Sequence, residues 1–216
     1  MLNLPKKHPK MKEYYIYNIP LFVVDDSETE LDISKFCSDV EEILPHALLN
    51  NVEVVYIGKF EDLKDRNAMF DQGAIYMTSM EPTIFDMLEN FIHEVAHSLE
   101  ARHGLNIYDN NLVREFLGKR QKLYELLTAE GYNIELKHFL DTEYNKQFDN
   151  FLANTVGYPT LLTLTMGLFA SPYGATSIQE YFANGFEKYY LDSPRTVGSI
   201  SPVLYRKIEE IINGDS

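Results

Sequence analysis

The residues with the clearest chemical pattern are His93, Glu94 and His97, which form an HExxH motif. Four residues of an α-helix advance about 400°, so the two imidazoles project from one face about one turn apart and can bind one Zn²⁺. Glu94 lies roughly 100° round the helix from His93. There it can accept the proton of a water molecule held in the open position of the metal. The motif therefore predicts one zinc ion per chain and a water-activating unit.

The helix that must carry this motif has its own start and stop signals. Thr83 and Asp86 form a capping pair, and Gly104 is a natural C-terminal stop. We therefore expect a helix over 84–103. Its apolar face is formed by residues at helical spacing, namely Ile84, Leu88, Phe91, Val95 and Leu99. The histidines lie on the opposite stripe, where a solvated helix surface is the alternative to a metal site.

Composition limits the domain count and the partners. The 216 residues are 45% hydrophobic, which is enough for one sizeable domain and too little for two comfortable ones. A net charge of −14 argues against nucleic acid and anionic membrane as partners, and favours a neutral or basic substrate. The single cysteine, Cys37, excludes an internal disulfide framework and is expected to be a buried structural thiol.

The sequence as written contains no pattern typical of a signal peptide or a membrane span. Residues 1–13 look like a loose basic arm, and no hydrophobic run follows that could serve as a signal peptide. No stretch approaches the length of a membrane span. We expect a cytoplasmic protein, although a secreted mature form that has lost its leader would have the same sequence.

The residues before the motif helix predict a small sheet. Segments rich in β-branched and aromatic residues predict strands, and one segment with apolar residues at helical spacing predicts a helix. In chain order, the expected elements are a strand at 14–24, a helix at 30–46, a strand at 52–57, a polar loop at 59–66 and a strand at 73–79. The order is therefore β-α-β-β-α, with the motif on the second helix.

The strand at 73–79 directly precedes the motif helix. An extended peptide can pair with the free edge of a strand through backbone hydrogen bonds. We therefore expect a peptide substrate to bind along four residues of this strand, namely Gly73, Ala74, Ile75 and Tyr76. An ordinary internal strand is the alternative.

The residues after the motif helix are predominantly helical in pattern. We expect helices at 111–129, 135–152, 159–169, 178–191 and 202–213. The apolar run at 159–169 is expected to be a buried core helix. Ser193-Pro194 is expected to end one helix, and Ser201-Pro202 to start the last one, which Gly214 stops.

A catalytic zinc site usually has three protein ligands, so a third is needed. Glu100 is on the same helical face as His93, but it rises about 10 Å along the axis, which suits a residue that orients a ligand or lies on the surface. The stronger candidate is Glu180, within the stretch YGATSIQEYFANGF at 173–186. Its alternative role is a capping box with Ser177.

The HExxH motif and the later stretch together resemble the zinc protease domains similar to anthrax lethal factor and the clostridial Pro-Pro endopeptidases. Their later stretch reads YGxTxxxE[FY]FAExF, and the resemblance covers residues 70–103 and 171–192. It implies a zincin-like fold of the gluzincin type in which His93, His97 and Glu180 hold the zinc. It also implies that Glu94 is the general base and that the Tyr173 hydroxyl stabilises the developing oxyanion. For Tyr173, packing is the alternative, because the chain has 15 tyrosines.

Two features depart from this family. Asn184 stands where the family has a second glutamate, one turn beyond Glu180. Its amide oxygen could still orient a histidine ligand by accepting an N–H. The stretch between His97 and Glu180 is also longer than in the compact members, so 105–170 looks like a helical insertion that could shape a cleft or dock a protein partner.

We therefore expect an α+β protein with a zincin-like metallopeptidase fold in a single domain over 1–216. Its parts would be a sheet and helix subdomain at 14–104, the helical insertion at 105–170 and C-terminal helices at 171–216. The expected function is zinc-dependent endopeptidase cleavage of an extended peptide or protein substrate. One alternative is a zincin-fold protein that serves as a structural or binding subunit with little turnover. A different zinc hydrolase such as a deformylase would need a cysteine ligand motif, which the sequence lacks.

Overall fold

The chain divides into two compact units, where composition predicts a single domain. The computed structural model describes residues 11–24 and 31–214. The N-terminal unit comprises the described residues up to Ala101, and the C-terminal unit comprises Arg102–Gly214. Each unit builds its own aromatic core, with Phe36 against Phe91 in the first and Phe116 against Tyr181 in the second. The helical segment at 105–170 is therefore not separated from residues 171–214.

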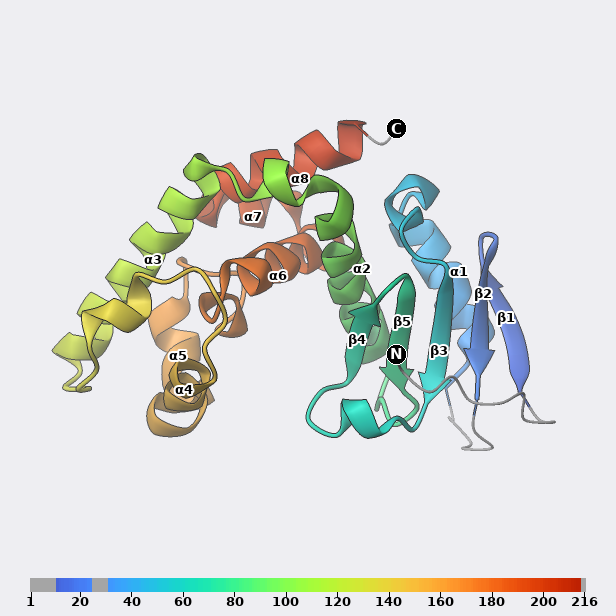
Figure 1. Cartoon of the computed structure of the whole chain (residues 1–216), viewed down its shortest axis with the longest axis horizontal. Coiled ribbons are helices and arrows are strands. Elements are labelled where there is room, and N and C mark those ends of the chain that lie inside the picture. Colours follow the sequence, from blue (N-terminus) through green and yellow to red (C-terminus); the bar gives the residue numbers. More distant parts are fainter. Residues whose placement is uncertain (1–10, 25–30, 215–216) are drawn as a thin grey trace. The chain divides into compact units, whose positions relative to one another are not determined.

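The fold class is α+β, as the sequence predicts: a small mixed sheet and a mostly helical C-terminal part (Figure 1). The N-terminal unit holds five strands, β1 (Lys12–Ile16), β2 (Ile19–Val23), β3 (Val54–Gly58), β4 (Ala68–Asp71) and β5 (Ala74–Thr78). Their order in the sheet is β1-β2-β3-β5-β4. The β2–β3 and β3–β5 pairs are parallel, whereas β1 and β4 pair antiparallel at the two edges.

The segment at 14–24 is a hairpin and not the single strand that its composition predicts. Ile16 pairs with Ile19, so Tyr17 and Asn18 form a two-residue turn, and Tyr17 adopts a left-handed backbone with φ of 54°. The Tyr17 hydroxyl donates to the carbonyl oxygen of Leu44 at 2.9 Å, which fixes the turn at the end of the first helix. Of the expected basic arm, residues 1–10 lie outside the described residues, and Lys12 already belongs to β1.

The free edge expected at 73–79 does not exist, because β4 pairs with that strand. Asp71 pairs with Ala74 across a tight turn in which Gln72 and Gly73 both have a positive φ, of 47° and 87°. Two consecutive left-handed residues are typical of the two-residue turns that join antiparallel strands. β4 has no local signal in the sequence, because its four residues include no β-branched side chain. β5 is therefore an internal strand, and the free edge on this side belongs to β4.

The N-terminal unit contains one whole helix and the larger part of a second helix. α1 (Ile33–Ile43) is shorter than the predicted 30–46, and residue 30 lies outside the described residues. α2 (Ile84–Ile107) carries the HExxH motif and begins as predicted, with the Asp86 N–H donating to the Thr83 hydroxyl at 3.1 Å. Gly104 does not end α2, because its backbone is not left-handed. The chain turns only where Asp109 caps the next helix.

The C-terminal unit is helical. Its elements are α3 (Asn110–Ala129), a 3₁₀ turn (Leu136–Phe139), α4 (Lys146–Asn150), a π-helix (Phe151–Gly157), α5 (Tyr158–Thr165), a 3₁₀ turn (Tyr173–Ala175), α6 (Ile178–Leu191), α7 (Pro194–Ile200) and α8 (Pro202–Gly214). The predictions for α3, α6 and α8 are confirmed. In the part of the chain that the structure describes, no helix combines the length and apolar character needed to cross a membrane.

The predicted helix at 135–152 is wrong, because tertiary contacts break it. The carbonyl oxygens of His138, in the 3₁₀ turn, and of Asp141, after it, accept hydrogen bonds from Arg120 and are not available to a continuous helix. α4 then starts afresh, where the Asn145 side chain accepts from the backbone N–H groups of Gln147 and Phe148. No pattern within 135–152 shows a partner that lies on α3.

Two further expectations for this unit need correction. The core helix predicted at 159–169 ends at Thr165, because Gly167 turns the chain with φ of 76°. It is also buried on one side only, since Leu162 is 56% exposed and Met166 is 80% exposed. Ser193-Pro194 does more than end α6: it also begins α7, because proline at the first helical position suits a helix start as well.

Candidate metal centre

His93 and His97 face the same point from one side of α2. Both are half-buried, and their Nε2 atoms are 3.2 Å apart. Two nitrogens bound to one tetrahedral zinc at ordinary bond lengths are about 3.3 Å apart. The separation of the two imidazoles therefore suits joint ligation of one metal ion without rearrangement of the helix.

Glu180 completes a group of three side chains that could bind a metal ion. One ligand atom from each of His93, His97 and Glu180 lies within 4.8 Å of the other two. Two imidazole nitrogens and one carboxylate oxygen are a donor set that zinc takes in catalytic sites, with a fourth position left open. This His-His-Glu group could hold a metal ion, as the sequence predicts.

The local structure around Glu180 separates the roles of its backbone and its carboxylate. Ser177 caps α6, and its hydroxyl accepts the Glu180 N–H at 3.1 Å. The cap therefore uses the backbone of Glu180. The capping role that the sequence allows for Ser177 and ligation by the Glu180 carboxylate are compatible.

Glu100 holds the ring of His97. Its Oε1 atom lies 2.7 Å from His97 Nδ1, one turn further along α2. A carboxylate at one ring nitrogen fixes the tautomer and orientation of an imidazole whose other nitrogen binds a metal. Glu100 thus has the orienting position that its distance along the helix predicts.

Glu94 is anchored to an edge of the sheet. Its side chain is buried, and Oε2 accepts a hydrogen bond from the backbone N–H of Phe70 at 2.7 Å. Phe70 lies in β4, opposite Ile75 of β5. Sequence reasoning missed this contact together with β4, because no local pattern joins two residues that are 24 positions apart.

Asn184 supports the first turn of α6. Its Nδ2 atom donates to the Glu180 carbonyl oxygen at 2.8 Å, and its Oδ1 atom accepts from the Ser171 hydroxyl. The sequence suggests that this oxygen accepts a histidine N–H, but the structure gives it Ser171 as a donor. Asn184 therefore ties the helix that carries Glu180 to the chain just before Tyr173.

Tyr173 begins the short 3₁₀ turn that leads into α6. Its carbonyl oxygen accepts from the Thr176 hydroxyl at 2.8 Å, which fixes the turn. Its ring is half-buried. A role for its hydroxyl in stabilising an oxyanion stays a prediction.

The four residues predicted to bind substrate lie in the β4–β5 turn and in the internal strand β5. Gly73 forms part of the β4–β5 turn, and Ala74, Ile75 and Tyr76 are buried in β5. Tyr76 stacks on Tyr56 with ring centroids 5.4 Å apart. The prediction that a peptide pairs along β5 is wrong, because β3 and β4 occupy both of its edges.

One carboxyl near the motif helix has no counterpart in the sequence analysis. Glu81 is buried in the loop before α2, and it accepts a hydrogen bond from Asn90 Nδ2 at 2.9 Å. Burial, together with the neighbouring carboxylates of Asp86 and Glu89, raises the pKa of Glu81 to about 7. An isolated glutamate in a polar loop gives no local signal of such burial.

Comparison of the chain with protein-family models, with curated proteins and with solved structures finds no match. The site therefore has to be interpreted from its own residues.

Proposed function

We propose that this protein is a zinc-dependent endopeptidase with a zincin-like fold. The observation that carries the proposal is the group formed by His93, His97 and Glu180, with Glu94 on the same helix as the histidines. Zinc bound by such a group lowers the pKa of a coordinated water and polarises a carbonyl oxygen. The resemblance of residues 173–186 to lethal factor-like zinc proteases supports the same assignment.

Four residues of the chain would then have separate roles in the hydrolysis. Glu94 accepts a proton from the attacking water and passes it to the nitrogen of the leaving amine. The Phe70 N–H keeps the carboxylate of Glu94 in place for both transfers. Glu100 holds His97, and the Tyr173 hydroxyl donates to the oxygen of the carbonyl under attack.

A peptide substrate would pair with β4. This is the free edge strand nearest to the motif, since its Phe70 N–H contacts Glu94. An extended peptide that runs along β4 would bring its backbone beside the general base. This proposal moves the expected substrate strand from β5 to its neighbour.

A second candidate function is a metal-holding binding or structural subunit with little turnover. The observation that favours it is Asn184, which stands where the resembling proteases have a glutamate. Its amide is already used by Glu180 and Ser171. Such a subunit would need the metal ligands but neither Glu94 nor Tyr173.

Metal analysis of the purified protein tests the proposal at its base. We expect about one zinc per chain in the wild type and none in His97→Ala. Lys207→Ala is a suitable control, because Lys207 pairs with Asp109 and Glu210 on the surface of the C-terminal unit. Unchanged zinc content in His97→Ala would exclude the proposed metal site at His93, His97 and Glu180.

A further inference from the structure

Arg120 is a buried guanidinium that forms no direct ion pair, although the Asp141 carboxylate is near enough to favour its charge. Its residue is 1% exposed, and its charged end lies over the rings of Phe116 and Phe148, at 5.3 and 4.4 Å from the ring centroids. Within the described residues, no carboxylate lies within ion-pair distance of it. Burial lowers its pKa to about 10, so it is charged at neutral pH.

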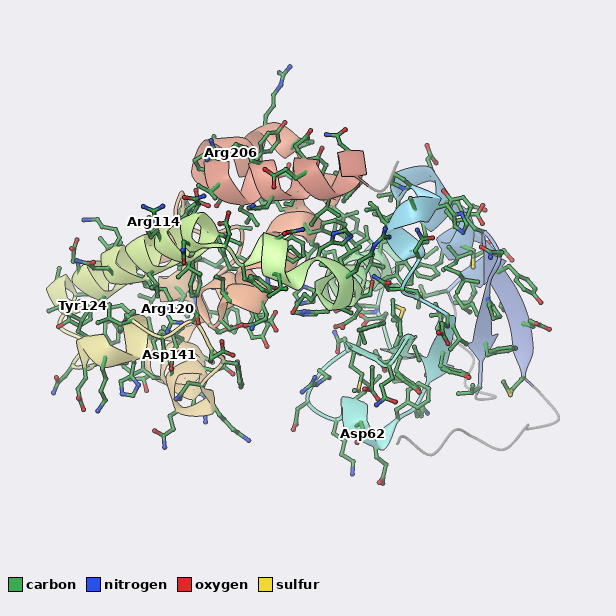
Figure 2. The ribbon with its side chains drawn as sticks, turned by 45° about the horizontal axis from the view of Figure 1, so that its top comes forward. Asp62, Arg114, Arg120, Tyr124, Asp141 and Arg206 are labelled. Carbon is green, nitrogen blue, oxygen red and sulfur yellow. The ribbon has the colours of Figure 1, made fainter. Side chains whose placement is uncertain are left out.

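The guanidinium of Arg120 donates its hydrogen bonds to backbone carbonyl groups. Nη1 donates to the Asp141 oxygen at 2.9 Å, and Nη2 donates to the oxygen of His138. Nη1 also makes a longer contact of 3.4 Å to the oxygen of Thr176. Figure 2 shows Arg120 beside Asp141. A single side chain thus joins the loop before α4 to the residue that precedes the cap of α6.

A backbone hydrogen bond also joins the loop before α4 to the start of α6. The N–H of Ile178, the first residue of α6, donates to the carbonyl oxygen of Thr142 at 2.9 Å. Thr142 directly follows Asp141, which Arg120 holds. Glu180 lies two residues after Ile178, in the first turn of α6. The loop that Arg120 fixes therefore supports the helix start that carries the proposed metal ligand.

Stability alone does not account for an arginine here. Burying a charge costs free energy, and apolar residues of similar volume often replace buried ion pairs without loss of stability. The guanidinium offers something that an apolar residue lacks, namely several N–H donors in a rigid plane. Such a group selects one arrangement of the carbonyls around it.

We propose that Arg120 is a positioning residue for Glu180, which fixes the start of α6 through the carbonyl groups of Asp141 and Thr176 so that the carboxylate reaches the metal. This proposal rests on the proposed function, because it needs Glu180 to be a ligand. The helical segment at 105–170 would then help to position Glu180, because α3 and the loop before α4 both belong to it.

Zinc affinity, measured by competition with a chelator, tests the proposal without reference to catalysis. We expect Arg120→Met to weaken zinc binding by roughly tenfold or more, as the loss of groups that orient a ligand typically does. Lys119→Met is the matched control. Lys119 is the neighbouring buried cation on α3, but it binds Ser201 and the carbonyl oxygens of Leu168 and Ile200. We expect the control to lose stability and keep its zinc affinity.

A double-mutant cycle locates the effect at Glu180. In the Glu180→Gln background, Arg120→Met should have no further effect on zinc affinity, because the ligand it positions is already lost. If Arg120→Met does not fold, Arg120→Lys replaces it in the double-mutant cycle, because lysine keeps the charge but lacks the planar guanidinium with its several N–H donors. We expect that variant to bind zinc roughly threefold to tenfold more weakly than the wild type.

Two results would overturn the proposed role of Arg120 and leave the proposed function intact. One is wild-type zinc affinity in the folded Arg120 variants. The other is an equal loss of zinc affinity on Arg120→Met in the wild-type and Glu180→Gln backgrounds. Failure of the proposed function gives a different result. In that case Glu180→Gln by itself would bind zinc as tightly as the wild type, and both proposals would fall.

Discussion

The carboxylate of Glu94 accepts a hydrogen bond at 2.7 Å from the backbone N–H of Phe70, in the edge strand β4. This contact joins the proposed general base to the strand along which a peptide would pair. A substrate that extends β4 would therefore lie beside Glu94, which already accepts the Phe70 N–H of that strand. Activity and substrate binding should depend on the same short strand.

Glu94→Gln should keep zinc and the fold but lose peptide hydrolysis. Glutamine retains an oxygen that can accept the Phe70 N–H, but it cannot take a proton from water. We expect the rate to fall by roughly 10²–10⁴-fold, the usual contribution of a general base. Paired measurements of zinc content and turnover check this. Equal turnover in both proteins would assign the activity to another group and favour the metal-holding subunit.

Glu180→Gln should weaken zinc binding strongly, with little effect on α6. The cap of this helix uses the Ser177 hydroxyl and the Glu180 backbone, which the substitution leaves in place. Ser177→Ala is the matched control: it should cost about 1 kcal/mol in the free energy of unfolding and keep the zinc. Denaturant unfolding and metal analysis of both variants provide the comparison. A variant with glutamine at 180 and full zinc content would exclude Glu180 as a ligand.

Glu100→Gln should weaken zinc binding without abolishing it. The carboxylate of Glu100 holds His97 through Nδ1 and does not belong to the ligand group. Loss of such an orienting carboxylate typically weakens metal affinity by about 10–100-fold. Chelator competition measures the change. Zinc affinity equal to that of the wild type would reduce Glu100 to a surface acid.

The buried carboxyl of Glu81 should make the protein less stable as the pH rises. Its pKa in the folded protein is about 7, above the ordinary value of 4.5, so the folded state holds a proton that the unfolded state releases. The resulting stabilisation is complete below about pH 4.5 and is lost as the pH rises through about 7. Unfolding at pH 5 and pH 7.5 should therefore show a larger loss of stability in the wild type than in Glu81→Gln. The same pH dependence in both proteins would show that Glu81 does not titrate in this range.

Local signals predicted those parts of the structure that depend on local contacts. α2 and α6 begin where Thr83 and Ser177 cap them, as the capping residues in the sequence indicate. The elements that the sequence did not reveal depend on distant partners. β4 exists through its pairing with β5, and the break within 135–152 exists through Arg120.

The central claim is hydrolysis that depends on a metal held by His93, His97 and Glu180. The most direct test is digestion of a mixed peptide library, with cleavage read by mass spectrometry, for zinc-loaded protein, chelator-treated protein and chelator-treated protein with zinc restored. We predict cleavage in the first and third samples and none in the second. Absence of cleavage by zinc-loaded protein, or equal cleavage after complete removal of the metal, would contradict the claim.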